Sequence, residues 1–186
     1  MCGITGYVGK SDIGLLKNMA DQISHRGPDG DGYYIDSNNG VHLAHRRLSI
    51  LDISGGAQPM LNQDSSIIVV FNGEIYNHLD LRLELASRGY QFKSINSDTE
   101  VLIHGYAEWG HNLVEKLNGM FAFCIYDKKN QQLFLARDRF GEKPLYFSYK
   151  SGSFAFGSEI TPLLVYDKTL NSLNHIAIQK LSLIHI

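Results

Sequence analysis

The sequence is poor in cysteine and proline and has no long apolar run. Its 186 residues include two cysteines and four prolines. Two cysteines are too few for a disulfide framework, so we expect a reducing, cytoplasmic setting. The apolar runs, such as 67–71, have the length of a strand and not of a membrane span. Residues 1–10 do not combine a charged head with an apolar stretch, so we expect no secretory signal.

Charge of either sign is also scarce. Seventeen Lys and Arg against 19 Asp and Glu give a formal net charge of −2, and charged residues make up 19% of the chain. Without a basic excess, a nucleic-acid-binding module is not expected. The hydrophobic fraction of 44% suits one globular domain of this length.

The residue pattern predicts an α+β fold. Apolar spacing predicts helices over 12–23, 79–88 and 97–109, with a short helical piece over 113–117. Short apolar or alternating runs predict strands over 1–9, 32–35, 41–45, 67–71, 120–126, 132–137, 145–149 and 153–156. Strands in clusters, interrupted by two main helices, are typical of antiparallel sheets with segregated helices.

Two details of this pattern are specific enough to check. The helix over 97–109 starts with Ser97-Asp98-Thr99-Glu100, which has the form of a capping box. The texture changes after residue 165, so we expect one domain over 1–165. We expect a weakly periodic, disordered exit segment over 166–186.

Cys2 is the first residue that points to chemistry. A cysteine in a first strand is usually a packing residue, and that interpretation stays open. Loss of Met1 would place a thiol and a free α-amine on one residue, with ordinary pKa values of about 8.5 and about 7.7–8.0. A partly neutral amine can accept the thiol proton, so nucleophile and base need no histidine. Cys124 lies inside an apolar run and is expected to pack.

Asn72-Gly73-Glu74 follows the predicted strand over 67–71. Asn-Gly is the commonest hairpin dipeptide, so a turn that ends the strand is one interpretation. The other is an oxyanion hole, because a glycine N–H beside an asparagine NH₂ offers two donors to one oxygen. The choice depends on whether Cys2 is a nucleophile.

Charged residues near these positions are candidates for binding a ligand. Arg46 and Arg47 follow a strand, so their side chains are expected on opposite faces, one in a site and one in solvent. A guanidinium binds a carboxylate through two parallel hydrogen bonds, although a surface pair is the commoner case. Glu74 and Asp98 are candidate acceptors for an ammonium group, but Asp98 is also typical of helix capping.

Other polar segments give weaker signals. The loop over 25–30 is either a lid or a structural turn, and the turn over 136–144 is expected to be a solvated hairpin end. Among the eight histidines, His42 and His45 would face opposite sides of a strand. The sequence has neither the HExxH or CxxC metal spacings nor a Gly-rich phosphate loop, so we expect no metal.

Seven segments together resemble one known family. They are Met-Cys-Gly-Ile at 1–4, His-Arg-Gly-Pro-Asp-Gly-Asp-Gly-Tyr at 25–33, His-Arg-Arg-Leu-Ser-Ile at 45–50, Phe-Asn-Gly-Glu-Ile-Tyr-Asn at 71–77, Ser-Asp-Thr-Glu-Val at 97–101, Leu-Asn-Gly-Met-Phe-Ala-Phe at 117–123 and Ala-Arg-Asp-Arg-Phe-Gly-Glu-Lys-Pro-Leu-Tyr at 136–146. In order and spacing they resemble the N-terminal glutaminase domain of glutamine-hydrolysing asparagine synthetase, a class II glutamine amidotransferase. The resemblance covers nearly all of residues 1–183.

The resemblance implies the N-terminal-nucleophile fold, a four-layer αββα sandwich of two antiparallel sheets. It implies L-glutamine as substrate and a glutamyl thioester on Cys2, freed by loss of Met1, as intermediate. It implies that Asn72 and Gly73 form the oxyanion hole. The α-carboxylate of glutamine would be held by Arg47 with the backbone of Leu48, Ser49, Ile50 and Leu51. The α-ammonium would lie near Glu74 and Asp98.

The end of the chain departs from the family, because Ile184-His185-Ile186 does not continue its pattern. We expect a truncated chain that lacks a fused synthetase domain. ATP and Mg²⁺ are expected only in that missing domain, with no cofactor here, and the resemblance allows a homodimer of the full-length enzyme. Two alternatives stay open: a glutamine-binding or regulatory module without turnover, and an ammonia donor for another carboxylate such as a sugar acid.

Overall fold

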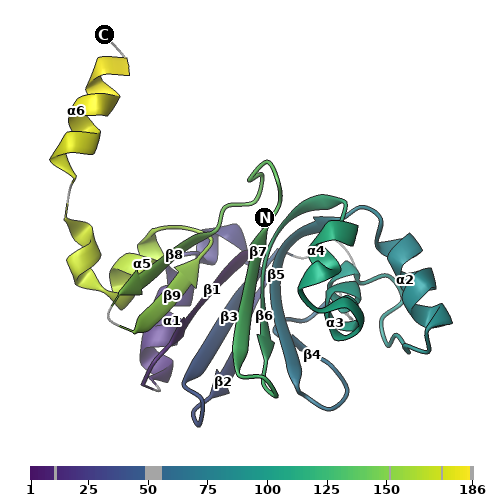
Figure 1. Cartoon of the computed structure of the whole chain (residues 1–186). Coiled ribbons are helices and arrows are strands. Elements are labelled where there is room, and N and C mark those ends of the chain that lie inside the picture. Colours follow the sequence, from purple (N-terminus) through teal and green to yellow (C-terminus); the bar gives the residue numbers. More distant parts are fainter. Residues whose placement is uncertain (11, 49–55, 151, 173, 185–186) are drawn as a thin grey trace.

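The computed structural model consists of two antiparallel sheets with helices on their outer faces (Figure 1). It describes all residues except 11, 49–55, 151, 173 and 185–186. The first sheet has the strand order β2-β3-β1-β9-β8, formed by Gly30–Asp36, Val41–Arg47, Gly3–Val8, Ser153–Gly157 and Tyr146–Lys150. The second has the order β4-β5-β6-β7, formed by Met60–Leu61, Ile67–Ile75, Gly119–Asp127 and Gln132–Arg137.

Alternation of side chains along the strands builds four layers. Residues such as Ile4, Leu43 and Val70 fill the space between the two sheets. The opposite face of the first sheet, with Tyr7 and Ala44, packs on α1 (Ile13–Asp21) and α5 (Thr161–Tyr166). The outer face of the second sheet packs on α2 (His78–Ser87), α3 (Asp98–Trp109) and α4 (Leu113–Lys116). The predicted αββα sandwich is therefore confirmed.

The helix starts follow the sequence pattern only in part. Asp12 caps α1, accepting a hydrogen bond from the Leu15 N–H at 3.0 Å. The capping box predicted for α3 is wrong, since the Ser97 side chain makes no capping bond. The Glu100 carboxylate instead accepts hydrogen bonds from the backbone of residues 93 and 94, at 2.7 and 2.8 Å. Those loop N–H groups need acceptors where the chain enters the helix, and Glu100 supplies them.

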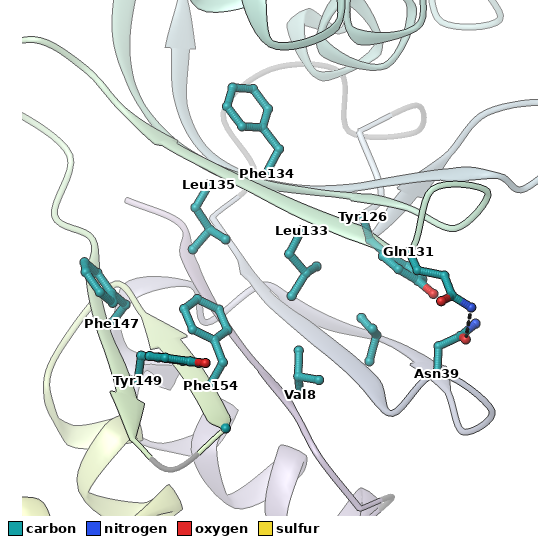
Figure 2. Close-up of a pocket in the computed structure, with 12 residues that line it drawn as sticks. Val8, Asn39, Tyr126, Gln131, Leu133, Phe134, Leu135, Phe147, Tyr149 and Phe154 are labelled. Atoms are coloured by element: carbon teal, nitrogen blue, oxygen red, sulfur yellow. Dashed lines mark hydrogen bonds between the residues drawn. The ribbon is translucent and has the colours of Figure 1, made fainter.

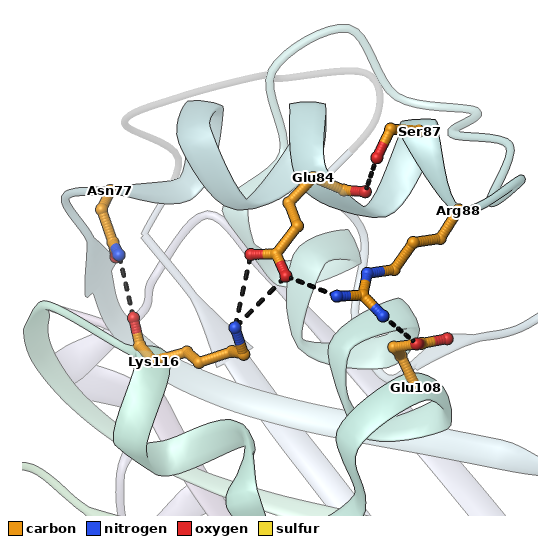
Figure 3. A network of polar contacts seen from close by, with 6 residues as sticks. All are labelled: Asn77, Glu84, Ser87, Arg88, Glu108 and Lys116. Atoms are coloured by element: carbon orange, nitrogen blue, oxygen red, sulfur yellow. Dashed lines mark hydrogen bonds and ion pairs between the residues drawn. The ribbon is translucent and has the colours of Figure 1, made fainter.

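A surface network joins the three helices that cover the second sheet (Figure 3). Glu84 of α2 binds the Lys116 ammonium of α4 at 3.2 Å and the Arg88 guanidinium at 3.0 Å. Arg88 also binds Glu108 of α3 at 2.7 Å. Exposed ion pairs add little stability one by one, so we assign this network a role in fixing how the helices lie against each other.

β5 is longer than the apolar run that predicted it. It reaches Ile75, and its pairing with β6 places Asn72 opposite Ala122 and Gly73 opposite Phe121. A turn that ends the strand at Asn72-Gly73 is therefore wrong. The strand continues because β6 offers a pairing partner across its whole length.

The end of the chain is more regular than expected. After α5, residues Lys168–Asn171 form the short helix η3 and His175–Ile184 form α6. α6 projects away from the two sheets (Figure 1). Among the described residues, no helix combines the length and apolar character required for a membrane span.

Candidate active site

A cavity of about 200 Å³ lies at one end of the layer between the sheets. Residues two apart on a strand share a face, so the apolar inner positions Ile4, Leu43 and Val70 have inner-face neighbours at this end. Those neighbours are Cys2 before β1, His45 and Arg47 on β3, and Asn72 on β5. The strands thus bring together Cys2 and Asn72, which lie 70 positions apart in the sequence.

Cys2 is half-buried and fixed from two sides. The Leu48 N–H lies 3.4 Å from Sγ, and Sγ lies 3.6 Å from the Leu48 carbonyl oxygen. Arg26, from the short helix η1 (Ser24–Arg26), donates from Nε to the Cys2 carbonyl oxygen at 3.1 Å and binds Glu159 at 3.0 Å. Cys124, by contrast, is fully buried in the core between the sheets, as predicted, and burial raises the pKa of its thiol strongly.

Three alternate N–H groups of β5 face the same edge of the strand. The Phe71 N–H donates to Gln58 Oε1 at 2.6 Å, and the Ile75 N–H donates to Asp98 Oδ2 at 3.1 Å. Because N–H groups of alternate residues point to the same side of a strand, the Gly73 N–H between them points to this edge. Gly73 itself lines the cavity there.

Asn72 supplies a second donor. Its side chain is 1% exposed, and Nδ2 has no hydrogen-bond partner among the described residues. A Cβ atom at Gly73 would lie 2.2 Å from the Met120 carbonyl oxygen, so only glycine fits the close pairing with β6 at this point. Asn72 and Gly73 therefore present two donors to one cavity, which is the arrangement that an oxyanion hole requires.

Glu74 and Asp98 give the cavity a negative side. Burial, followed by the charge of Asp98, raises the pKa of Glu74. Burial also raises the pKa of Asp98, although its hydrogen bond from the Ile75 N–H favours the charged form. Asp98 thus contacts β5 in addition to starting α3. A cationic ligand group would offset the cost of holding these two carboxylates close together.

The two adjacent arginines point to opposite faces of β3, as predicted, but the expectation that one of them is solvated is wrong, since the Arg46 side chain is only 15% exposed. Arg46 donates to the Ala20 carbonyl oxygen at 3.2 Å and forms an ion pair with Asp21, on the side of α1. Arg47 lines the cavity together with Leu48. Of the residues that the sequence placed beside Arg47, Ser49, Ile50 and Leu51 lie outside the described residues.

The residues around the cavity that sequence reasoning missed include Arg26, His45, Gln58 and Lys143. The prediction of a solvated turn over 136–144 is wrong for Lys143, which is 7% exposed, with Nζ 3.4 Å from Met1 Sδ. Arg26 and Lys143 could have been found from the sequence, because each is a charged residue in a Gly- or Pro-containing turn. For His45 the available signal was the shared face with Arg47.

A second, larger hollow of about 710 Å³ opens between β7 and the β8–β9 hairpin (Figure 2). Its walls are mainly apolar, with Leu133 and Leu135 facing Phe147 and Phe154, and the hydrogen bond between Asn39 and Gln131 closes one side. The described residues of its lining include no cysteine, serine, histidine or carboxylate. The chemistry is therefore assigned to the smaller cavity around Cys2.

Comparison with known sequences gives one consistent result. A family profile described as a glutamine amidotransferase domain matches residues 1–186. "Asparagine synthetase [glutamine-hydrolyzing] 3" of Bacillus subtilis (strain 168) is 43% identical over 173 residues, which is 89% of this chain and 28% of that protein. "Asparagine synthetase B [glutamine-hydrolyzing]" of Escherichia coli (strain K12) is 42% identical over 176 residues, 91% of this chain and 31% of that protein. The chain thus spans less than a third of the length of these relatives.

Solved structures share the fold. One is a glutamine phosphoribosylpyrophosphate amidotransferase from B. subtilis complexed with ADP and GMP, with a TM-score of 0.72 and 22% identity, covering 88% of this chain and 43% of that chain. Another, described as the allosteric regulatory enzyme of purine biosynthesis, has a TM-score of 0.74 and 24% identity over 88% of this chain and 43% of that chain. At these identities the likeness concerns the arrangement of the two sheets and their helices.

Proposed function

Because this chain belongs to the glutamine amidotransferase domain family, we propose that it hydrolyses the side-chain amide of L-glutamine to glutamate and ammonia. One observation carries the proposal. The Cys2 thiol lies in the same cavity as two donors, the Asn72 side chain and the Gly73 N–H, so a nucleophile and an oxyanion hole share one space. Roles for these residues follow from that geometry.

The reaction is an acyl transfer that starts once Met1 is removed. The freed α-amine of Cys2 accepts the thiol proton, and Sγ forms a bond to the amide carbon of glutamine. Asn72 and Gly73 hold the negatively charged oxygen, for which one donor is typically worth ~10²–10³ in rate. The amine passes the proton to the departing nitrogen, the C–N bond breaks, and ammonia leaves. Water then hydrolyses the glutamyl thioester to glutamate.

The rest of the cavity matches the amino-acid end of glutamine. Arg47 binds the α-carboxylate through its guanidinium, and Leu48 lies beside it with its backbone. Glu74 and Asp98 accept hydrogen bonds from the α-ammonium. A zwitterion withdrawn from water needs both charges paired, and the cavity has a cation and two carboxylates for this purpose.

The destination of the ammonia is a further part of the proposal. The names of the two asparagine synthetase relatives support an acceptor that becomes asparagine, made in the part of those proteins that this chain does not span. ATP and Mg²⁺ belong to that part in our proposal, and a fused synthetase domain is the proposed partner. A sugar acid in place of aspartate remains the alternative acceptor.

The test compares glutamate release by three forms of the chain, each checked by intact mass for loss of Met1. The parent chain should release glutamate and ammonia from glutamine in equal amounts. Cys2→Ser should lose nearly all of this activity, whereas Cys124→Ala removes the other thiol and should keep it. Turnover in Cys2→Ser equal to that of the parent chain would contradict the proposed nucleophile.

A covalent label shows whether Cys2 is reactive in a chain that binds glutamine. A diazoketone analogue of glutamine should add one mass equivalent to Cys2 in the parent chain and none in Cys2→Ser. If the processed chain binds glutamine but neither releases glutamate nor takes the label, it is a binding module without turnover.

A further inference from the structure

Among the described residues that line the cavity, two have a buried side-chain atom without a hydrogen-bond partner: Asn72, at Nδ2, and His45, at Nε2. Both residues line the cavity that contains Cys2. A buried polar group without a hydrogen-bond partner destabilises the fold, so such a pair in one cavity points to a ligand that satisfies both. Asn72 Nδ2 can only donate. His45 Nε2 donates or accepts according to the protonation state of the ring.

His45 is held as a neutral acceptor. It lies on the inner face of β3, is 1% exposed, and pairs through its backbone with Ile4 of β1. Burial lowers the pKa of His45 to about 4, with a smaller effect from the Arg47 charge, while a hydrogen bond to the Phe71 backbone favours the charged form. The ring is therefore neutral near pH 7. Its N–H is donated to the Phe71 carbonyl, which leaves Nε2 with a lone pair.

A donor and an acceptor in one cavity complement a primary carboxamide. The carboxamide oxygen accepts a hydrogen bond from Asn72, and its NH₂ group donates one to the lone pair of a neutral imidazole. A carboxylate or an ester has no N–H to donate, so either would place an oxygen lone pair against that of Nε2. The same two atoms therefore distinguish an amide from its hydrolysis product.

We propose that His45 is a specificity-determining residue that recognises the NH₂ group of the substrate carboxamide through Nε2, while Asn72 holds the carboxamide oxygen. This rests on the proposed function and names the chemical group that the site selects. Recognition of the NH₂ group would make the cavity bind glutamine more tightly than glutamate, although the two share their α-carboxylate and α-ammonium.

The test compares two substrates that form the same thioester: L-glutamine, and the γ-methyl ester of L-glutamate, which has no side-chain N–H. His45→Phe should lower kcat/KM for glutamine by about 10–100-fold, as expected for one lost hydrogen bond in a buried site, and lower that for the ester by less than about threefold. His45→Gln, which keeps a carbonyl acceptor, should recover part of the loss. His42→Phe is the matched control, because His42 is buried on the opposite face of β3 and stacks on Tyr7.

Equal losses for both substrates in His45→Phe would overturn the proposal and indicate a structural role. Unchanged glutamine turnover in both His45 variants would overturn it as well. A binding arm keeps the test independent of turnover: in a Cys2→Ala background, His45→Phe should reduce the preference for glutamine over glutamate in calorimetry, and an unchanged preference counts against His45. A parent chain that hydrolyses neither substrate would contradict the proposed function, while the binding arm would still decide the role of His45.

Discussion

The Cys2 thiol lies within hydrogen-bond distance of both backbone polar groups of Leu48, the N–H and the carbonyl oxygen. The Leu48 N–H lies 3.4 Å from Sγ and the Leu48 carbonyl oxygen lies 3.6 Å from it. The carbonyl can only accept from the thiol, whereas the N–H can donate to a thiolate. The contact therefore changes character with the charge on sulfur, and the N–H stabilises the form that attacks.

The first prediction concerns that N–H. Leu48→Pro removes the donor and should slow alkylation of Cys2 by iodoacetamide about tenfold at fixed pH, because a hydrogen bond to a charged group is typically worth about 1.5–3 kcal/mol. Leu48→Ala keeps the N–H and should alkylate like the parent chain. The rates are read from intact mass against time. Equal rates in the proline and alanine variants would show that the N–H does not support the thiolate.

The second prediction separates activity from stability at Asn72. Asn72→Ala should lower kcat for glutamine hydrolysis ~10²–10³-fold through loss of an oxyanion donor. Its Tm should equal or exceed that of the parent chain, because the variant removes a buried donor that has no partner among the described residues.

The matched control for Asn72 is another asparagine. Asn62 accepts hydrogen bonds from the backbone of Ser66 and Ile67, each at 2.9 Å. Asn62→Ala should therefore lose about 1–2 kcal/mol of unfolding free energy and keep its kcat. A marked drop in Tm in Asn72→Ala would mean that its side chain holds the fold, and the oxyanion assignment would lose its support.

The third prediction follows from the raised pKa of Glu74, caused by burial and by the charge of Asp98. A carboxyl whose pKa is higher in the folded than in the unfolded state lowers stability once it is ionised in the fold. Glu74→Gln should therefore raise Tm at pH 7, and the gain should shrink as pH falls through the folded pKa. The same variant should raise KM for glutamine about 10–100-fold, because the substrate ammonium loses an acceptor.

Glu115→Gln, on the exposed surface of α4, serves as the control for Glu74 and should change neither Tm nor KM. A Glu74→Gln chain that is less stable than its parent at pH 7 would contradict the assigned cause of the shift. An unchanged KM would place the substrate ammonium elsewhere.

Strand periodicity was enough to anticipate much of this fold and part of the cavity. Opposite faces for Arg46 and Arg47, and for His42 and His45, follow directly from alternation along β3, and the structure has both. The role of Cys2 depended on its position in the sequence, and its closeness to Asn72 required the packing of one sheet on the other. That packing is set by apolar residues, such as Ile4 and Val70, whose pairing across the layer has no local signal.

The failures have the same origin. Glu100 suited a capping box by local rules, yet it satisfies the loop before α3 because that loop enters the fold there. Lys143 belongs to a turn that looks solvated in sequence, yet the turn folds over the N-terminus and buries the lysine. Asn72-Gly73 suited a hairpin until β6 supplied a partner strand. Each outcome depends on a segment distant in sequence.

The last prediction concerns how that turn is held. The buried carboxylate of Asp138 accepts hydrogen bonds from four backbone N–H groups, those of residues 121, 140, 142 and 143, at 2.9–3.2 Å. Burial alone would raise the pKa of Asp138, but these hydrogen bonds outweigh it and lower the pKa. A carboxyl with a lowered folded pKa contributes stability above its unfolded pKa of about 3.9 and loses it as pH falls through the folded value.

Asp138→Asn should therefore lower the unfolding free energy by about 2–4 kcal/mol at pH 7, because an amide cannot accept with both of its terminal atoms. The difference from the parent chain should begin to narrow as pH falls below about 4, where Asp138 becomes protonated in the unfolded chain but stays ionised in the folded one, and it should disappear below the lowered folded pKa. Urea denaturation at pH 7 and pH 3 measures both quantities. Glu115→Gln, at an exposed carboxylate on α4, is the control. A difference that stays constant between the two pH values would mean that the charge of Asp138 does not hold the turn, and that Lys143 reaches the cavity by packing alone.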